Sequence, residues 1–275
     1  MKLYLKTKDF LITGEEFRLE INTELDMLVT KPQPENLEAY YESEKYISHS
    51  DASNTTMDKI YQIVKKYSIK KKVRLINSFT KTNKNLLDVG AGTGDFLAGA
   101  KKQGWQVCGV EPNTTAIANA SKKGIRLYSD FSEIKNKKFE VITLWHVLEH
   151  LPDLDAQIKN LKSLLTPNGT LIIAVPNFKS FDARWYKQNW AAYDVPRHLW
   201  HFSKTSISAL FKKQNMKVVK TKPLWFDSFY VALLSEEHKT GKKNMVRAFA
   251  VGLWSNACAL FNKECSSVIY ILKNS

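Results

Sequence analysis

Three glycines at alternate positions follow a short apolar run that is typical of a buried strand. The stretch is LLDVGAGTGDF, at residues 86–96, and its glycines are Gly90, Gly92 and Gly94. Glycine permits positive φ and lets the backbone approach a ligand closely. The spacing is G-x-G-x-G rather than G-x-G-x-x-G, so the dinucleotide fingerprint fits it poorly. We therefore expect a loop that binds a nucleotide-like cofactor but not by the dinucleotide motif.

Two acidic residues farther along the chain extend this pattern. Glu111 ends the run WQVCGVE, about 20 positions after the loop, where a carboxylate can accept both hydroxyl groups of a ribose. Asp130 lies in the run IRLYSDF, just after a predicted third strand, where it could accept a hydrogen bond from an adenine amino group. Together these residues predict a nucleoside site at the ends of three strands.

A third pattern, H-x-x-E-H, is formed by His146, Glu149 and His150. On a helix this would be an inverted zinc-protease signature. Here it starts at the end of FEVITLW, which we interpret as a buried strand, so the protease interpretation is disfavoured. In the simpler interpretation Glu149 and His150 begin the turn into the next helix and satisfy backbone groups there.

The later run DVPRHLWHFS, at residues 194–203, adds further candidates. His198 could act as a proton acceptor, and a structural role is the alternative. Arg197 could bind an acidic group of a substrate or pair with Asp194. Several aromatic residues nearby could line an apolar or sugar-binding pocket, although a role in the core is the alternative for most of them: Trp185, Tyr186, Trp190, Tyr193, Trp200 and Trp225.

The elements that position these residues alternate between strands and helices. LLDV, WQVCGV, IRLY, FEVITLW and TLIIAV predict strands, and amphipathic segments between them predict helices that end near a glycine or a Pro-Asn-Gly turn. Such alternation predicts an α/β fold with a mostly parallel sheet covered on both faces. KVVKTK and SSVIYILK predict two closing strands, which makes seven in all.

Composition excludes several classes of protein. The net charge is +14, but only six of the 41 basic residues are arginine, whereas sites that read phosphates or bases favour the guanidinium group. The three cysteines contain no C-x-x-C pair, so neither a disulfide framework nor a structural zinc site is expected. No signal peptide is evident. We expect a cytoplasmic protein for which nucleic acid is an unfavoured partner.

Together, LLDVGAGTGDF, GVEPN, YSDF, FEVITLWHVLEHLPD and LTPNGTLIIAVPN resemble the class I S-adenosylmethionine-dependent methyltransferases. The resemblance covers residues 55–223 and implies a Rossmann-like, doubly wound sheet. It implies that the glycine loop holds the methionine part of the cofactor, that Asp88 orients its ammonium group and that Glu111 binds its ribose. The full set of cofactor residues is then Asp88, Gly90, Ala91, Gly92, Gly94, Glu111, Pro112, Asp130, Phe131, Trp145 and His146.

The resemblance also indicates which residues are candidates for catalysis, metal binding and substrate binding. His146, His150 and His198 are the candidate catalytic residues, with His146 and His198 favoured as proton acceptors. Related quinone O-methyltransferases bind a divalent metal at the loop of His146, but this chain has histidine where those have an acidic residue, and we predict no metal. The expected substrate contacts are Trp190, Tyr193, Arg197 and His201.

The predicted organisation has three parts. Residues 1–34 form an N-terminal β-hairpin-type appendage without the paired cysteines of similar bacterial enzymes, and residues 35–84 form a helical cap or linker. Residues 85–275 form the methyltransferase domain, with lid-like insertions at about 177–203 and 224–264.

The predicted function is methyl transfer from S-adenosylmethionine, with S-adenosylhomocysteine as product, to a small-molecule, glycan or lipid-linked acceptor, and O-methylation is favoured. The alternatives are a non-catalytic nucleoside-binding protein on the same fold and an NAD-dependent oxidoreductase. The run LWHVLEHLPD lacks the N/D-P-P-Y motif of base-modifying enzymes. We expect a monomer or homodimer, and a weak peripheral contact of MVRAFAVGLW with a membrane stays open.

Overall fold

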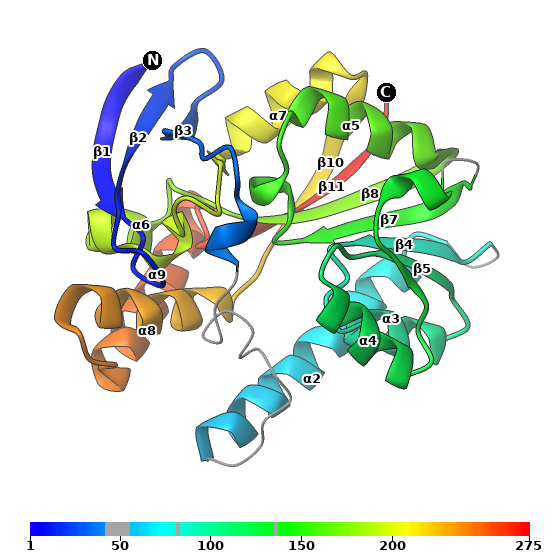
Figure 1. Cartoon of the computed structure of the whole chain (residues 1–275), viewed down its shortest axis with the longest axis horizontal. Helices are drawn as coiled ribbons and strands as arrows, with labels where there is room; N and C mark the ends of the chain where they lie inside the picture. The colour runs from blue at the N-terminus through cyan, green and yellow to red at the C-terminus, as the bar shows by residue number, and fades with distance from the viewer. Residues whose placement is uncertain (42–55, 81–82, 135–136) are drawn as a thin grey trace. The chain divides into compact units, whose positions relative to one another are not determined.

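A seven-stranded sheet is the centre of the fold. The computed structural model describes residues 1–41, 56–80, 83–134 and 137–275, and places the strands in the order β10–β11–β8–β7–β4–β5–β6 (Figure 1). β4 pairs in parallel with β5 and β7, and β5 with β6. The strands are β4 Asn85–Val89, β5 Gln106–Val110, β6 Leu127–Tyr128, β7 Phe139–Trp145, β8 Leu165–Pro176, β10 Met216–Pro223 and β11 Ser267–Asn274. The predicted α/β fold with a mostly parallel seven-stranded sheet is confirmed.

One strand begins earlier than the sequence predicts. β8 starts at Leu165, directly after the preceding helix, so the Pro-Asn-Gly segment that was expected to form a turn belongs to the strand. The side-chain amide of Asn274 donates to the backbone oxygen of Pro167 at 3.2 Å. A proline and a glycine at the end of a strand interrupt fewer ladder bonds than in its middle, which explains why the extended conformation is tolerated here.

Contacts divide the chain into two compact units. Unit 1 contains residues 1–49, 148–155 and 174–270, and unit 2 contains residues 50–147, 156–173 and 271–275. Each unit is therefore assembled from separate parts of the sequence. The predicted domain boundaries after residues 34 and 84 stay a prediction, and residues 42–55 of the predicted helical cap lie outside the described residues.

Unit 2 contains the glycine loop and several helices. They are α2 Thr56–Asn77, α3 Asp95–Lys101, α4 Thr114–Lys122 and most of α5 Leu154–Leu164, with a short 3-10 helix, η2, at Phe131–Ile134. α4 begins at a cap in which the Asn113 side chain accepts the N–H of Ala116 at 2.9 Å. α2 and α3 pack closely because Gly99 has no side chain: a Cβ there would lie 2.9 Å from Cγ2 of Ile69.

Unit 1 contains a second, antiparallel sheet in the order β1–β2–β3–β9. Its strands are β1 Lys2–Lys8, β2 Glu16–Asn22, β3 Met27–Lys31 and β9 Trp200–His201. Alternate residues of β2, such as Phe17 and Leu19, are buried, as expected for a sheet with one covered face. β9 pairs with β3 through Leu28 and His201, a contact between residues far apart in the sequence.

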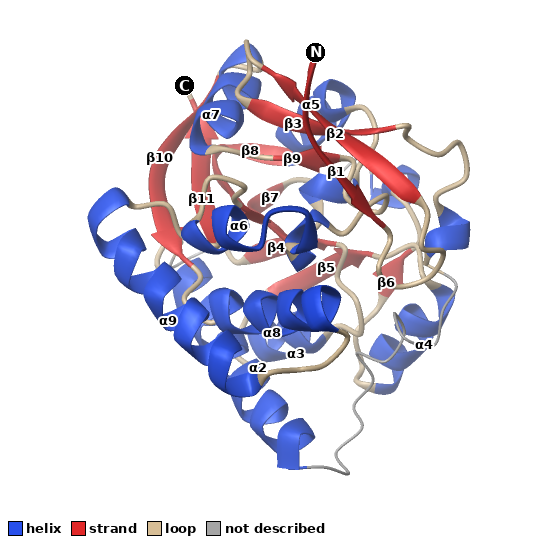
Figure 2. Cartoon of the chain, turned by 90° about the vertical axis from the view of Figure 1, so that its left-hand side faces the viewer, coloured by secondary structure: helices blue, strands red, loops and turns tan. Residues whose placement is uncertain are grey.

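The rest of unit 1 includes β10, parts of β8 and β11, and several helices; Figure 2 shows the helices in blue. These helical elements are the 3-10 helices η1 Glu38–Tyr40, η3 Leu148–His150, η4 Lys187–Asn189 and η5 Ala191–Tyr193, and the helices α6 Phe181–Tyr186, α7 Lys204–Lys213, α8 Asp227–Thr240 and α9 Met245–Asn262. No helix among the described residues is both long and apolar enough to cross a membrane. The two predicted insertions thus form α6 with its following turns, and the helix pair α8–α9.

A buried carboxylate holds part of unit 1 together. Asp182, on α6, accepts hydrogen bonds from Trp190 Nε1 at 2.8 Å, Ser255 Oγ at 2.7 Å and Ser266 Oγ at 2.7 Å. Asp182 and both serines are fully buried. These bonds connect α6 to η5, α9 and the start of β11.

We expect Asp182→Ala to destabilise the protein by about 3 kcal/mol or more, because three buried donors each lose their acceptor at a cost of about 1–3 kcal/mol if unsatisfied. Urea unfolding followed by circular dichroism measures the loss. Asp182→Asn keeps one carbonyl oxygen and is the matched control, for which a smaller loss is expected. Equal stability of Asp182→Ala and wild type would contradict this assignment.

Candidate functional site

The glycine loop between β4 and α3 has the conformation that its sequence requires. Gly90, Gly92 and Gly94 all have positive φ, of 66°, 53° and 75°. A Cβ at Gly90 would lie 2.4 Å from Cγ2 of Val147, so any larger residue there would force the Val147 side chain to move. A Cβ at Gly92, in contrast, would meet nothing within 4 Å. The backbone at Gly92 therefore borders open space, as a loop that receives a ligand must.

Glu111 is bound to this loop, as its position after β5 predicts. Its Oε2 accepts the N–H of Gly92 at 2.9 Å and its Oε1 accepts the N–H of Asn113 at 3.0 Å. A carboxylate has about four lone-pair sites, so about two remain for further donors. This geometry leaves Glu111 able to accept the hydroxyl groups of a ribose beside Gly92.

Asp88 lies at the end of β4 and is almost fully buried. Thr143 Oγ1 donates to its Oδ1 at 2.6 Å. Burial raises the pKa of Asp88 to about 7, although the Thr143 hydrogen bond and the charge of Lys72 act in the opposite direction. Asp88 thus changes charge near neutral pH and would be more strongly ionised beside a ligand cation.

The remaining cofactor candidates also belong to unit 2. The N–H of Ala91 donates to the backbone oxygen of Val110 at 3.1 Å. Pro112 follows Glu111, and Phe131 begins η2. Asp130 Oδ1 accepts the N–H of Ser132 at 2.5 Å, so one carboxylate oxygen already stabilises this turn. The structure thus places all of them at the ends of β4, β5, β6 and β7.

Trp145 is the last residue of β7 and His146 follows it, and the two form the last part of this group. The ring of Trp145 meets Phe96 edge-on at 5.6 Å between centroids, and Lys72 Nζ lies 4.4 Å from its centroid. Within the described residues, the buried indole Nε1 of Trp145 has no acceptor, which a bound ligand could supply. His146 has φ of 58°. Lys72 was not expected at the site, because nothing in α2 marks it among many lysines.

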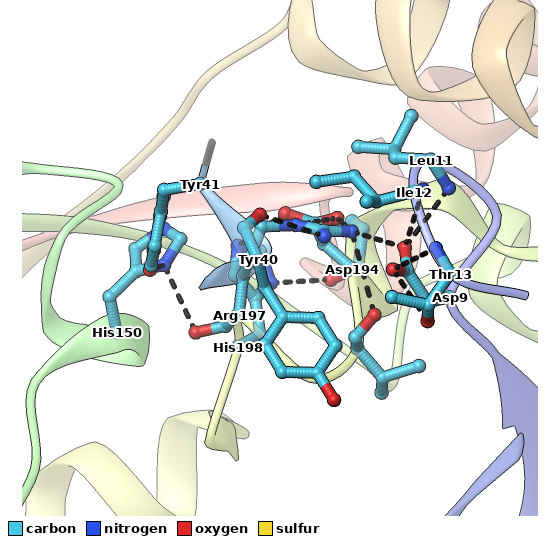
Figure 3. Close-up of polar contacts among 12 residues, drawn as sticks. Asp9, Leu11, Ile12, Thr13, Tyr40, Tyr41, His150, Asp194, Arg197 and His198 are labelled. Atoms are coloured by element: carbon cyan, nitrogen blue, oxygen red, sulfur yellow. Dashed lines mark hydrogen bonds and ion pairs between the residues drawn. The ribbon is translucent and has the colours of Figure 1, made fainter. Parts of the chain in front are cut away.

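Three further candidate histidines, His150, His198 and His201, belong to unit 1, and the first two lie close together (Figure 3). The rings of His150 and His198 meet at 4.5 Å between centroids, and those of His198 and His201 at 6.3 Å. His150 Nδ1 lies 3.1 Å from the backbone oxygen of Arg197, and His198 Nδ1 lies 2.9 Å from that of Ala192. A carbonyl only accepts, so we assign the proton of the His198 ring to Nδ1, which leaves its Nε2 with a lone pair. His150 Nδ1 also lies 2.8 Å from the hydroxyl oxygen of Tyr41, which can donate as well as accept.

Burial and neighbouring charge control the protonation of these rings. Burial, with the nearby His198, lowers the pKa of His150 to about 4. The same two causes lower the pKa of His201 well below its usual value, and its Nε2 lies 3.0 Å from Thr30 Oγ1. His150 and His201 are therefore neutral at physiological pH, and His150 is a weak base for catalysis.

One set of residues could hold a metal ion. Ligand atoms of Glu149, His150 and His198 lie within 4.8 Å of one another. Two imidazoles and a carboxylate suit a transition metal such as zinc. The expectation that the H-x-x-E-H loop holds no metal stays a prediction.

Arg197 lies deep in unit 1, with 1% of its surface exposed. Its Nη2 donates to Asp194 Oδ1 at 2.6 Å and to Asp9 Oδ1 at 2.9 Å, and its Nη1 donates to the backbone oxygen of Tyr40 at 3.3 Å (Figure 3). The guanidinium therefore pairs with Asp194, the second role expected of it. Its expected contact with an acidic substrate group finds no support here, because Asp9 and Asp194 already neutralise it.

The two carboxylates depend on this cation. Burial alone would raise the pKa of Asp9, but hydrogen bonds from Arg197 and the N–H of Thr13 outweigh it, and the pKa lies below its usual value. Burial would also raise the pKa of Asp194, but the charges of His198 and Arg197 outweigh this effect and lower that pKa. Both groups are ionised at neutral pH and stabilise the fold there.

The aromatic candidates divide between core and surface. Tyr186, Trp190 and Tyr193 belong to the hydrophobic core of unit 1, so the core interpretation holds for them, and a direct substrate contact of Trp190 or Tyr193 finds no support in this burial. Trp200 is half-buried, and its Nε1 donates to the backbone oxygen of Leu151 at 2.8 Å. Trp185 and Trp225 are exposed, contrary to a core role.

A family model described as "Methyltransferase domain" matches residues 61–221, more than half of the chain. The chain belongs to this methyltransferase-domain family. The resemblance to class I S-adenosylmethionine-dependent methyltransferases is therefore confirmed. The matched region of the methyltransferase domain includes the glycine loop, Glu111 and the H-x-x-E-H loop.

Curated relatives and solved structures agree with this family. The methyltransferase domain is 31% identical over 115 residues to a ubiquinone biosynthesis O-methyltransferase of Pasteurella multocida, and 33% over 113 residues to that of Coxiella burnetii. These matches cover 35% and 37% of this chain, and the chain spans about half, 48%, of each relative. Magnesium protoporphyrin IX methyltransferase of Synechocystis, solved with S-adenosylhomocysteine, has a similar fold, with TM-score 0.57, 14% identity and coverage of 86% and 97% of the two chains.

We expect Arg197→Met to destabilise the fold by about 3–5 kcal/mol at neutral pH, because it leaves two buried carboxylates without their cation. In the variant the pKa values of Asp9 and Asp194 rise, so protonation at acid pH removes the unpaired charges. The deficit relative to wild type should therefore shrink as the pH falls from 7 toward 4.

Urea unfolding of both proteins across this pH range tests the expectation. Arg18→Met removes an exposed arginine of β2 and is the matched control. A deficit for Arg197→Met that stays constant with pH would show that the loss comes from packing and not from the unpaired carboxylates.

Proposed function

We propose that the protein transfers the methyl group of S-adenosylmethionine to a small-molecule, glycan or lipid-linked acceptor, most simply to an oxygen atom. The observation that carries this proposal is Glu111, whose carboxylate is held against the glycine loop by the N–H of Gly92 at 2.9 Å. That carboxylate presents acceptors for a ribose beside open space at Gly92. The family and the O-methyltransferase relatives support the same activity.

The residues of unit 2 fit such a cofactor. We assign Glu111 to the ribose hydroxyls, the backbone of Gly90–Gly94 to the methionine part and Asp88 to its ammonium group. Asp130 and Trp145 border the adenine and the sulfonium side, and Trp145 Nε1 offers a buried donor. When bound, S-adenosylmethionine supplies a methyl group already activated on sulfur. The protein then has to align the acceptor and exclude water.

Transfer to a hydroxyl group also needs a proton acceptor. His146 and His198 are the proposed acceptors, since the low pKa of His150 makes it a poor base. His198 is oriented by the carbonyl of Ala192, which leaves its Nε2 able to take a proton. His146 lies directly after Trp145 in the sequence, next to the proposed cofactor.

The proposal also includes the expected location and oligomeric state of the protein. A cytoplasmic location and a monomer or homodimer fit it. A non-catalytic nucleoside-binding protein would use the same Glu111 geometry and differs only in lacking turnover. An NAD-dependent oxidoreductase is disfavoured by the G-x-G-x-G spacing.

Calorimetric titration with S-adenosylmethionine and S-adenosylhomocysteine tests the cofactor. We expect both to bind wild type, and Glu111→Ala to lose about 1–3 kcal/mol of binding free energy, the cost of a lost buried hydrogen-bonding partner. Glu111→Gln should lose less, since one oxygen can still accept. Asp155→Ala, which removes an exposed carboxylate on α5, should bind like wild type. Failure of wild type to bind either compound would refute the proposal.

Proton release provides a second test, at Asp88. Because the pKa of Asp88 is about 7, this carboxyl is largely protonated at about pH 6, and the ammonium group of the cofactor should drive its ionisation. Binding should therefore release a proton at that pH and strengthen as the pH rises toward 8. Calorimetry in two buffers with different ionisation heats measures the release. The same release from Asp88→Asn would assign the proton to another group.

A further inference from the structure

Helix α9 buries its small residues and exposes its large apolar ones. The buried positions are Ala248, Val251, Gly252, Ser255 and Ala259. The exposed apolar positions include Val246 at 82%, Phe249 at 60%, Trp254 at 61% and Phe261 at 88% exposure, and also Met245, Leu253 and Leu260. An ordinary surface helix has the opposite arrangement, with its large apolar side chains toward the core.

Close packing against α8 fixes this orientation. A Cβ at Gly252 would lie 3.0 Å from Cα of Phe229 and 3.1 Å from its backbone nitrogen. Only a small residue permits the two helices to approach so closely. Ser255 Oγ also donates to the buried Asp182. α9 therefore cannot turn its large side chains inward without losing both contacts.

The exposed apolar surface continues onto α8. Trp225 and Phe226 precede this helix and Tyr230 lies in its first turn, and all three are exposed. The rings of Phe229 and Phe249 stack at 5.3 Å between centroids and join the two helices. α8 and α9 lie side by side in both views (Figures 1 and 2). We call the surface formed by Trp225, Phe226, Tyr230 and the exposed apolar residues of α9 the α8–α9 apolar face.

Positive charge borders this face. Between Glu237 and Glu264 the chain has no acidic residue, and it has five basic ones: Lys239, Lys242, Lys243, Arg247 and Lys263. Lys243 and Arg247 reach Glu237 and Glu236, at 3.6 Å and 3.2 Å. For the ammonium groups of Lys239 and Lys242, no carboxylate of the described residues lies within ion-pair distance.

The apolar side chains of the α8–α9 apolar face and its basic border together indicate the chemistry of the partner that this face binds. Large apolar and aromatic side chains bordered by lysines are typical of helices that lie in the interface of a bilayer with anionic lipids. A second copy of the chain is a poorer occupant, since a two-fold interface would bring the same basic border against itself. The net charge of +14 adds a general attraction to an anionic surface.

We propose that the α8–α9 apolar face binds the surface of a membrane that contains anionic phospholipids, with α9 parallel to the bilayer and its large side chains at the level of the acyl chains. This binding does not depend on methyl transfer. It would give the protein access to acceptors that partition into the bilayer.

Co-sedimentation of the full chain with vesicles tests the proposal. We expect binding to phosphatidylcholine vesicles that contain phosphatidylglycerol and much weaker binding to phosphatidylcholine alone. Trp254→Ser with Phe261→Ser should lower the partition coefficient by about tenfold or more, because two large apolar side chains are removed from the lipid. Leu3→Ser with Val219→Ser removes two exposed apolar side chains outside the face and is the matched control.

Further variants separate charge from apolar contact. Lys239→Glu with Lys242→Glu, and raised salt, should each weaken binding to the anionic vesicles. Because all these side chains are exposed, the variants should unfold at the same temperature as wild type, and circular dichroism checks this. Sedimentation velocity shows whether the face instead joins two copies.

Three results would overturn the proposal. The first is a wild-type protein that does not bind anionic vesicles. The second is binding that the Trp254 and Phe261 substitutions leave unchanged. The third is a dimer that these substitutions dissociate without any effect on vesicle binding.

Discussion

The buried guanidinium of Arg197 connects the segments of unit 1 that position the histidines of this unit. Arg197 joins Asp9, 188 positions away, to Asp194, three positions away. Asp9 in turn accepts the N–H groups of Leu11 and Thr13 and so shapes the turn between β1 and β2. Asp194 accepts the N–H of His198 through its backbone oxygen at 3.0 Å. Burying these charges is costly in itself, so the network is best understood as a device that fixes one arrangement of the chain.

The sequence predicted the parallel strands and the cofactor loop because those features are local. Strands buried on both faces appear as continuous apolar runs, and a loop with three positive φ angles strongly favours glycine at those positions. Glu111 could be predicted because its distance from the loop follows from the length of one helix and one strand. Asp9 and Lys72 could not, since their contacts join distant segments and neither residue type is unusual where it lies.

The aromatic segments show the limit of such reasoning more clearly. Trp190 and Tyr193 are as suggestive of a sugar pocket as Trp185, yet the first two are core and the third is exposed. For the segment that forms α9, the sequence shows an apolar run within a predicted insertion, and only the packing of Gly252 against Phe229 shows which side of the helix faces outward. An aromatic residue type makes burial of a side chain favourable, but the packing of the neighbouring elements decides whether that side chain is buried.

The interleaving of the two units has a consequence for how the protein is made. β1–β3 are synthesised first, but their partner strand β9 and the helices that complete their core come more than 150 residues later, and unit 1 closes only at residue 270. Unit 2 likewise includes residues 271–275. Unit 1 is therefore complete only after its late segments have been synthesised. The apolar side chains of β2 and β3 have to remain uncovered until β9 and the helices of their core are made, a stage at which chaperones act.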